Sequence, residues 1–492
     1  MKHFVTVFLL LAICLTFVFL LSSCGGSDKT ASTTGNGTPN EPEAKTFQYN
    51  LFSDEGLLCV VRNSKCGYIN PAGQEVIPCK YYAASNFQNG YAIVQEKSGD
   101  PYYFIKPDGT KLLDTPFSGA TLFDSQGRAV IKKSQNGKCE LIDKDGKSYM
   151  TAQAISSGDN GLYLFMDEDN LCGVADKDGT VLIDPRYDGM DFIHDQFILF
   201  NSGDNHMTCR TDLFLAYRKV SSGTYQYVID LNGKELYSAD TTCKGITYET
   251  NSQTFCAHYP SKVVLFGSDG KVVKTIEEEC ESVGFFLGGF GLVYKSQSKE
   301  EIVVKMIDAQ GTVGFNSKTS GYVSDDVNLY GDVHIRSSLS AGGKSGLADG
   351  KTGKILIPVT YDWVDSDGFD ENGICFARKT SNEYVALDRT GKTVFSKSCD
   401  GLERLAFRDA PYYIAEYEVG GKTSYELLDA KGVVLRTFGT KYDELNEYGD
   451  GFGLYDDGYI VCRETESGNI AIININNNYE LVCLTIYDNI IR

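Results

Sequence analysis

Hydrophobic residues at helical spacing are missing from almost the whole chain. Beyond the first residues, no stretch sustains the apolar period of 3.6 residues that an amphipathic helix needs. The 31 Tyr and 27 Phe residues occur instead with Val, Ile and Thr, the residue types that favour strands. This pattern argues against a helical or mixed α/β fold. We therefore predict an all-β protein.

The motifs of common catalytic and cofactor sites are also missing. The chain has no P-loop, no zinc-protease motif and no nucleophile elbow, and its five histidines are scattered. The segments Asp143-Lys-Asp145 and Asp176-Lys-Asp178 resemble fragments of a calcium loop, but the remaining ligands of such a loop are absent. We predict no catalytic residue, no metal site and no cofactor.

Positive charge is scarce. The chain has 46 Lys and Arg against 66 Asp and Glu, a formal net charge of −20. Such a surface repels phosphate backbones and anionic lipid headgroups, which disfavours nucleic acid as a partner. Acidity by itself does not identify the partner that the protein has.

The 15 cysteines do not have the spacing of a metal or redox site, because no two form a C-x-x-C pair. Two of them, Cys14 and Cys24, belong to the N-terminal segment discussed next, and thirteen remain. We predict that most of these are small buried apolar residues in strands. A disulfide between Cys59 and Cys66 on one hairpin stays open as an alternative.

The N-terminus is a signal sequence in which one lysine precedes an apolar run from Phe4 to Leu21. The end of this run, Leu21-Ser22-Ser23-Cys24, resembles the bacterial lipobox, which implies cleavage after residue 23 and a lipid on Cys24. An uncleaved membrane anchor is the alternative, and both export the rest of the chain. Residues 24–46 are rich in Gly, Ser, Thr and Asn and predict a flexible polar tether. We expect a protein held by its lipid on the extracytoplasmic face of a bacterial cell membrane.

Residues 47–492 contain a turn signature that recurs about every 40 residues. It consists of two or three apolar residues, Asp or Asn, two variable residues and Gly, and its Asp and Gly suit a hairpin with a bulge. The copies end at Gly73, Gly109, Gly146, Gly179, Gly233, Gly270, Gly311, Gly353, Gly391 and Gly432, with a degenerate eleventh copy ending at Asn477.

The sequence around these turns resembles the WG repeat family of bacterial β-repeat proteins. The best copies contain Cys66-Gly67 followed by Glu75-Val-Ile-Pro78, Cys172-Gly173 followed by Val181-Leu-Ile-Asp-Pro185, and Ser345-Gly346 followed by Ile355-Leu-Ile-Pro358. The Trp of the family's Trp-Gly pair is replaced here by Cys66, Cys172 and Ser345. The only Trp, Trp363, lies elsewhere. We expect this position to be buried in each repeat.

Each repeat offers four short segments of strand type, which is the content of one propeller blade. About eleven blades exceed the usual four to eight, so we predict either two rings or one large ring. The longest spacing, from Gly179 to Gly233, predicts a break or an insertion near residues 190–225. The first repeat lacks its first segment, and the last repeat stops at Tyr487-Asp488-Asn-Ile-Ile-Arg492, so we expect the two termini to complete one blade.

Three classes of function remain. We favour a non-catalytic binding or scaffolding lipoprotein of the cell envelope with a protein or glycan ligand, an interpretation that rests on fold-level analogy. A structural or solute-capturing envelope component without a single site is the alternative. An enzyme acting on glycans is the least favoured, and would require carboxylates with raised pKa in one deep pocket.

Overall fold

The computed structural model describes residues 50–158, 161–194, 209–286, 288–294, 303–327, 331–338, 342–370, 372–404, 412–443, 453–455, 457–477, 480–483 and 489–491. The signal sequence, Cys24 and the polar tether lie outside these ranges. The described part contains no helix that is long and apolar enough to cross a membrane.

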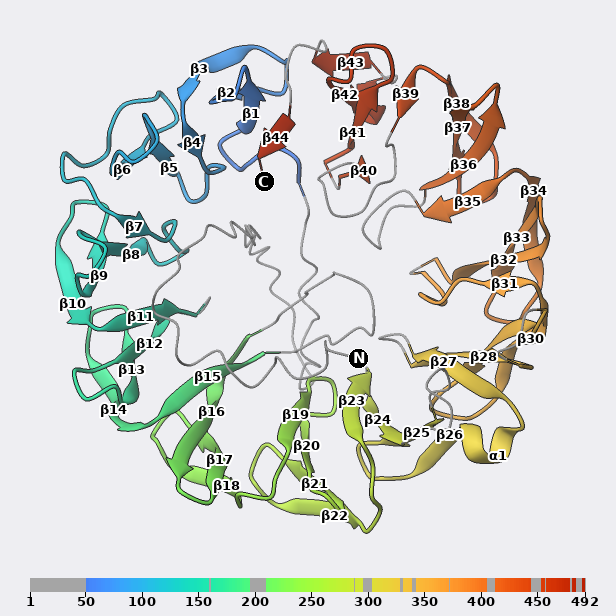
Figure 1. The fold of residues 1–492 in the computed structure, drawn as a ribbon, viewed down its shortest axis with the longest axis horizontal. Coiled ribbons are helices and arrows are strands. Elements are labelled where there is room, and N and C mark those ends of the chain that lie inside the picture. The colour runs from blue at the N-terminus through green and yellow to red at the C-terminus, as the bar shows by residue number, and fades with distance from the viewer. Residues whose placement is uncertain are drawn as a thin grey trace, which may run out of the picture.

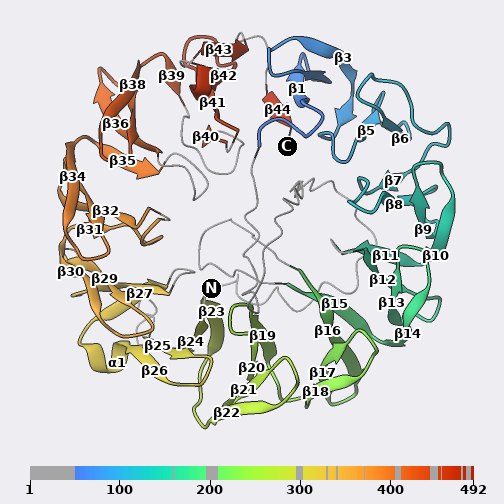
Figure 2. The ribbon, with the colours of Figure 1, turned by 180° about the vertical axis from the view of Figure 1, so that it is seen from behind.

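The described strands form eleven antiparallel sheets that stand side by side in one ring (Figure 1). The view from behind shows the same single ring (Figure 2). The prediction of an all-β repeat protein of about eleven units is confirmed, and of the two arrangements left open, one large ring is correct. Each sheet is here called a blade, and its strands follow one another from the centre of the ring to the periphery, except that in blade 11 β40 lies nearest the centre (Figure 1).

Blades 1 to 6 contain the following strands: in blade 1, β44 (Asn489–Ile491), β1 (Leu58–Arg62), β2 (Lys65–Ile69) and β3 (Glu75–Tyr81); in blade 2, β4 (Ala83–Ala84), β5 (Ala92–Gln95) and β6 (Tyr102–Ile105); in blade 3, β7 (Gly119–Ala120), β8 (Arg128–Lys132), β9 (Cys139–Asp143) and β10 (Ser148–Ala152); in blade 4, β11 (Ala154–Ser157), β12 (Leu162–Met166), β13 (Cys172–Asp176) and β14 (Val181–Tyr187); in blade 5, β15 (Gly189–His194), β16 (Cys209–Val220), β17 (Gly223–Asp230) and β18 (Glu235–Ala239); in blade 6, β19 (Gly245–Glu249), β20 (Thr254–His258), β21 (Val263–Gly267) and β22 (Val272–Ile276).

Blades 7 to 11 continue the ring: in blade 7, β23 (Ser282–Phe286), β24 (Gly289–Tyr294), β25 (Val303–Asp308) and β26 (Val313–Asn316), followed by α1 (Ser317–Ser320); in blade 8, β27 (Val323–Val327), β28 (Asp332–Arg336), β29 (Ser345–Asp349) and β30 (Ile355–Tyr361); in blade 9, β31 (Trp363–Val364), β32 (Ile374–Thr380), β33 (Glu383–Asp388) and β34 (Thr393–Ser398); in blade 10, β35 (Gly401–Arg404), β36 (Tyr412–Val419), β37 (Lys422–Asp429) and β38 (Val434–Gly439); in blade 11, β39 (Tyr442–Asp443), β40 (Gly453–Leu454), β41 (Tyr459–Glu464), β42 (Ile470–Asn474) and β43 (Glu480–Cys483), with the short 3₁₀-helix Ile475–Asn477 between the last two strands.

The recurring turn connects the last two strands of a blade, and its chemistry is the one expected from the sequence. In blade 4, the Asp176 carboxylate accepts from the amides of Asp178 at 2.9 Å and of Thr180 at 2.8 Å. The ten turn glycines have φ between 72° and 81°, a region that side chains other than Gly rarely adopt. The acidic residues of these turns therefore bind backbone amides.

The same glycines also permit close contact between blades, which the sequence did not reveal. A Cβ atom added to Gly270 in blade 6 would lie 2.1 Å from the carbonyl oxygen of Leu236 on β18 in blade 5. A Cβ atom on Gly179 in blade 4 would lie 2.3 Å from the carbonyl oxygen of Tyr149 on β10 in blade 3. The turn of one blade thus rests on the outer strand of the blade before it.

The glycine in the Trp-Gly position of blades 1, 4 and 8 faces a bulge. In blade 1, Cys66 pairs with Tyr81 and Tyr68 pairs with Ile77, so β3 contains two extra residues opposite Gly67. A Cβ atom on Gly67 would lie 2.6 Å from the carbonyl oxygen of Ile77. Blades 4 and 8 repeat this arrangement at Gly173 and Gly346. The residues in the family's Trp position, Cys66, Cys172 and Ser345, are all buried, as predicted.

The hydrophobic core is divided among the spaces between blades. Leu57, Tyr68 and Ile77 of blade 1 pack with Phe87 and Val94 of the blade 2 segment. Corresponding clusters fill the interface between every two successive blades around the ring. Of the eleven cysteines whose side chains are described, nine are buried in such surroundings. This agrees with the prediction that most cysteines act as small apolar residues.

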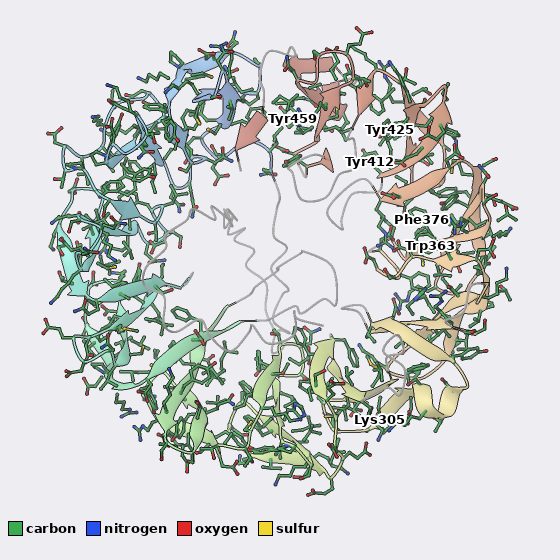
Figure 3. All side chains as sticks on the ribbon, viewed as in Figure 1. Lys305, Trp363, Phe376, Tyr412, Tyr425 and Tyr459 are labelled. Carbon is green, nitrogen blue, oxygen red and sulfur yellow. The ribbon has the colours of Figure 1, made fainter. Side chains whose placement is uncertain are left out.

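The two ends of the chain meet in blade 1. Strand β44 pairs with β1 through Val60 and Ile490, among other residues. The carboxylate of Asp457 in blade 11 accepts from the amide of Leu51 at 3.1 Å and from the amide of Phe52 at 3.2 Å. The Phe52 ring contacts the Tyr459 ring edge-on at a centroid distance of 5.0 Å, and Figure 3 shows Tyr459 beside blade 1. The predicted joining of the termini in one blade is thus present.

The break or insertion predicted near residues 190–225 falls within blade 5. Strands β15 and β16 belong to one sheet and pair through Met190 and Ala216, so the ring continues across this position. Residues 195–208 of the connection between them lie outside the described residues.

Deleting Ile486 to Arg492 should lower the thermal unfolding midpoint by at least about 2 °C, because it removes β44 and exposes the edge of β1. The exposed edge should also reduce the monomer fraction in size-exclusion chromatography. Deleting the same number of residues from the tether, Thr30 to Asn36, is the control and should change neither quantity. Equal midpoints for both deletions would contradict closure as a source of stability.

Gly270→Ala should destabilise the protein by roughly 2 kcal/mol more than Gly90→Ala. Both glycines have positive φ, so both substitutions strain the backbone, but nothing lies within 4 Å of an added Cβ at Gly90. The difference between the two free energies of unfolding in urea isolates the contact between blades 5 and 6. Equal destabilisation by the two substitutions would show that blade 5 shifts to accommodate the added methyl group without a loss of stability.

Candidate interaction surface

The predicted lipidation site, Cys24, lies outside the described residues. Within the described part of the chain, no group of three or more His, Cys, Asp or Glu side chains is placed to hold a metal ion. The site must therefore be sought among the polar networks between blades and the exposed faces of the ring.

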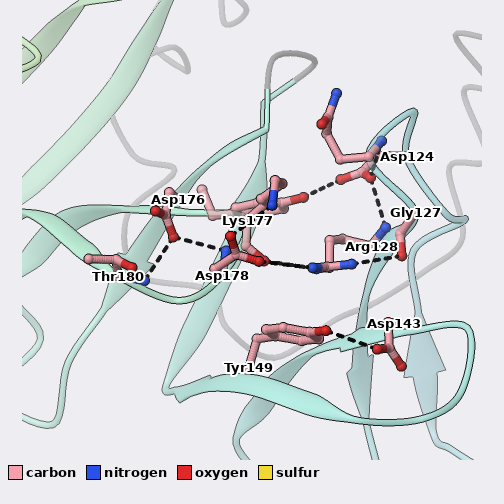
Figure 4. A network of polar contacts seen from close by, with 11 residues as sticks. Asp124, Gly127, Arg128, Asp143, Tyr149, Asp176, Lys177, Asp178 and Thr180 are labelled. Atoms are coloured by element: carbon pink, nitrogen blue, oxygen red, sulfur yellow. Dashed lines mark hydrogen bonds and ion pairs between the residues drawn. The ribbon is translucent and has the colours of Figure 1, made fainter.

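A polar network connects blades 3 and 4 (Figure 4). Arg128 on β8 donates from Nε to the carbonyl of Lys177 at 2.8 Å, and its Nη2 lies 3.2 Å from Oδ1 of Asp178. Its guanidinium also lies over the ring of Tyr149, 4.0 Å from the centroid. Because only 11% of the Arg128 side chain is exposed, the group is buried in these contacts and is a structural link between blades.

A second type of link recurs at the turn between the first two strands of a blade. Asp370, in the turn Phe369-Asp-Glu-Asn-Gly373, accepts from the hydroxyl of Tyr413 in blade 10 at 2.8 Å. Asp124, in the corresponding turn of blade 3, accepts from the hydroxyl of Tyr163 in blade 4. Burial raises the pKa of Tyr163 and of Tyr413, and the facing carboxylate adds to each shift, so both tyrosines act as donors. These paired side chains hold neighbouring blades together.

Carboxylates also gather at the inner strand of blade 10. Asp365 forms an ion pair with Arg404 at 3.2 Å and accepts from the amide of Asp367 at 3.0 Å. Burial raises the pKa of Glu416 to about 7, and the nearby charges of Glu403 and Glu418 add to the shift. A Cβ atom on Gly401 would lie 2.9 Å from Oε2 of Glu416, so this carboxylate lies directly over the backbone of β35. Packing against β35 and the ion pair with Arg404 therefore account for the positions of these carboxylates.

The outer strands carry a set of exposed apolar side chains at equivalent positions of the repeat, here called the outer apolar band. Its members follow the turn glycine and are Val76, Val181, Leu182, Val272, Val273, Val313, Ile355, Val394, Val433, Val434 and Leu435. They come from seven blades and account for most of the exposed large apolar residues of the described part. Exposed apolar residues that recur within three positions of the turn glycine are a candidate interaction surface.

Two kinds of outer strand carry this band. Those of blades 1, 4 and 8 contain Pro78, Pro185 or Pro358 together with the two-residue bulge described above. Strands β22 and β38 contain no proline, and their residues after the turn glycine align as Val272-Val-Lys-Thr-Ile276 and Val434-Leu-Arg-Thr-Phe438. Proline hinders the pairing of a sheet edge with another strand and distinguishes blades 1, 4 and 8 from β22 and β38, although these two strands also contain register shifts.

Comparison with known proteins confirms the repeat resemblance. Residues 67–98 and 173–205 match the family model for the WG containing repeat. Both stretches begin at the glycine of the Trp-Gly position, in two of the three copies singled out from the sequence. No curated protein sequence matches the chain.

Several solved structures are similar in shape. One is a eukaryotic initiation factor, with 10% identity over 78% of this chain and 96% of that one and a TM-score of 0.36. Another is the WD40 β-propeller domain of Doa1, with 14% identity over 54% of this chain and 89% of that one and a TM-score of 0.23. Saccharomyces cerevisiae Sqt1 has 13% identity over 64% of this chain and 93% of its own, with a TM-score of 0.26.

The Glu416→Gln variant should be more stable than the natural chain at pH 8 by about 1 kcal/mol, a value reduced because this side chain is partly solvated. The folded-state pKa of Glu416, about 7, lies above the ordinary value of 4.5. Glu416 therefore makes its full contribution to the free energy of unfolding below pH 4.5, where it is protonated. This contribution is lost as the pH rises through 7. Urea unfolding at pH 5 and pH 8 measures the difference in free energy of unfolding between the variant and the natural chain. Glu383→Gln, at an exposed carboxylate beside Lys379, is the control and should show no such gain.

Proposed function

We propose that this chain is a lipid-anchored, extracytoplasmic binding or scaffolding module that has no catalytic role and engages a protein or glycan of the cell envelope. The repeat β-propeller-like ring fits a binding or scaffolding role. The observation that carries the proposal is the outer apolar band, because its exposed valines, leucines and isoleucine recur within three positions of the turn glycine on seven blades.

The ring is suited to this role because it presents many similar surfaces on a rigid frame. Each blade packs against the next through an apolar cluster, and turn glycine contacts, ion pairs or tyrosine–carboxylate hydrogen bonds reinforce several of these interfaces. A ligand that contacts several outer strands would find their spacing fixed before binding, which reduces the entropy lost on association. The lipobox at Leu21 to Cys24 and the polar tether after it support the membrane location.

Cys24→Ala should abolish lipid attachment and release the protein from the membrane fraction. Metabolic labelling with a fatty-acid analogue, followed by fractionation of the cells, measures both effects. Ser23→Ala keeps the small residue before the cysteine and is the control that should remain labelled. Undiminished labelling of the Cys24→Ala variant would contradict the lipoprotein assignment.

The binding role is tested by releasing the natural protein from its membrane with mild detergent and measuring its native mass. A stoichiometric complex with a protein or with bound glycan supports the proposal. A mass equal to that of the lipidated chain alone, under conditions that preserve other envelope complexes, would contradict it. The lipid anchor and the binding role are thus tested separately.

A further inference from the structure

The hairpin of β1 and β2 places two cysteines on one face of blade 1. Cys59 on β1 lies opposite Tyr68, and Cys66 on β2 lies opposite Val61. Opposite residues share a face, as do residues two apart on a strand, so Cys59 and Cys66 are diagonal neighbours. Both are buried in the apolar cluster between blades 1 and 2, and both are free thiols in this structure.

The turn of this hairpin brings the two thiols together. Its two residues, Asn63 and Ser64, have φ of 53° and 57°, the conformation of a tight turn whose twist matches that of the strands. The right-handed twist of the ribbon moves a residue of the first strand toward the diagonal residue that is nearer the turn on the second strand. Cys59 and Cys66 occupy these positions, and the Cys59 thiol donates a hydrogen bond to the Cys66 sulfur. The two sulfur atoms thus face each other, as a disulfide requires.

Blades 4 and 8 do not repeat this pair. In blade 4, Cys172 is in the Trp position and Leu164 is its diagonal neighbour. In blade 8 the same two positions hold Ser345 and His334. Burial at the Trp position accounts for one cysteine in a blade, and it therefore does not explain why Cys59 is also a cysteine.

The two thiols have different surroundings. Cys66 is the nearer to solvent, because its Sγ lies 3.9 Å from the carbonyl oxygen of Tyr82, a residue that is 48% exposed. The hydrogen bond from Cys59 lowers the pKa of Cys66, and the positive charge of Lys65 acts in the same direction. Burial raises the pKa of Cys59. Because the thiolate is the species that attacks a disulfide, Cys66 is suited to attack first.

We propose that Cys59 and Cys66 are a redox-active pair, which exchange with a disulfide-bearing oxidant converts into one disulfide across β1 and β2. The Cys66 thiolate attacks one sulfur of the oxidant and releases its other half as a thiol, which leaves a mixed disulfide on Cys66. Cys59 then loses its proton and attacks the Cys66 sulfur, which releases the second half of the oxidant as a thiol. The protons of both cysteines and two electrons pass to the oxidant. Such oxidants are present outside the cytoplasm, the location proposed above.

The disulfide forms in the strand where the ring closes. Cys59, Val60 and Val61 of β1 pair with the three residues of β44, so closure rests on a short ladder. A covalent bond from β1 to β2 restricts β1 when the sheet opens, which stabilises the edge that receives β44. Oxidation of the pair therefore strengthens ring closure. This consequence does not depend on the proposed binding role.

The test uses the full chain with Cys79→Ala as its background. Cys79 packs on the other face of the sheet but shares a tryptic peptide with Cys66. The reduced, folded chain is incubated with oxidised glutathione and quenched with acid, and its free thiols are alkylated in urea. Trypsin cleaves between Cys59 and Cys66 at Arg62 and Lys65. Mass spectrometry should then find the two peptides joined by a disulfide, and the same linked peptides should appear from the natural chain.

Single substitutions in the same background separate the two steps. In Cys59→Ala, Cys66 should accumulate as a mixed disulfide with glutathione, because the second thiol is missing. In Cys66→Ala, Cys59 should remain free. Cys172, the buried cysteine at the same repeat position of blade 4, is the internal control and should be alkylated in every sample.

Oxidation should slow amide hydrogen exchange in β44 at least about threefold in the Cys79→Ala chain and leave it unchanged in the variant that also lacks Cys59. Unchanged exchange in a chain that contains the disulfide would overturn the link to ring closure. The redox pair itself would be overturned if Cys66 does not react, if it retains glutathione while Cys59 is alkylated, or if Cys172 reacts as readily. None of these outcomes bears on the membrane complex that tests the binding role.

Discussion

Every blade of this protein buries its apolar faces against the blades on either side, and the rest of the structure depends on this constraint. A blade of three to five short strands has no core of its own, and the described apolar clusters each span two successive blades. An open row of such blades would leave one apolar face exposed to water at each end. Closing the row through the pairing of β44 with β1 buries both apolar faces and pairs one exposed strand edge.

The repeat encodes this arrangement through a few positions rather than through a long conserved core. The turn Asp accepts hydrogen bonds from backbone amides, and the turn Gly adopts positive φ and contacts the preceding blade. The Gly after Cys66, Cys172 or Ser345 has no side chain that would collide with the bulge in the outer strand. Where the family has Trp, this chain has a small buried residue opposite a tyrosine. The space between blades is filled by different side chains at different interfaces, while the backbone geometry is preserved.

Charge and apolar surface are distributed unequally over the ring. Carboxylates gather at inner strands and at the turns, where ion pairs, tyrosine hydroxyls or backbone amides engage many of them. The outer strands β22 and β38 are instead apolar and basic. These two strands therefore expose apolar and basic side chains on a chain whose net charge is −20.

The sequence by itself determined the strand content, the number of repeats, the turn chemistry and the joining of the termini, because each of these depends on local residue types or on the incomplete first and last repeats. It also identified Cys66, Cys172 and Ser345 as occupants of one buried position. It left open whether the repeats form one ring or two, because this choice depends on the small angle between successive blades. The contact of each turn Gly with the preceding blade, the tyrosine–carboxylate links and the exposed edges of β22 and β38 were decided only by the tertiary structure. All of them involve residues that are brought together across the space between blades, where no spacing along the chain reports the distance.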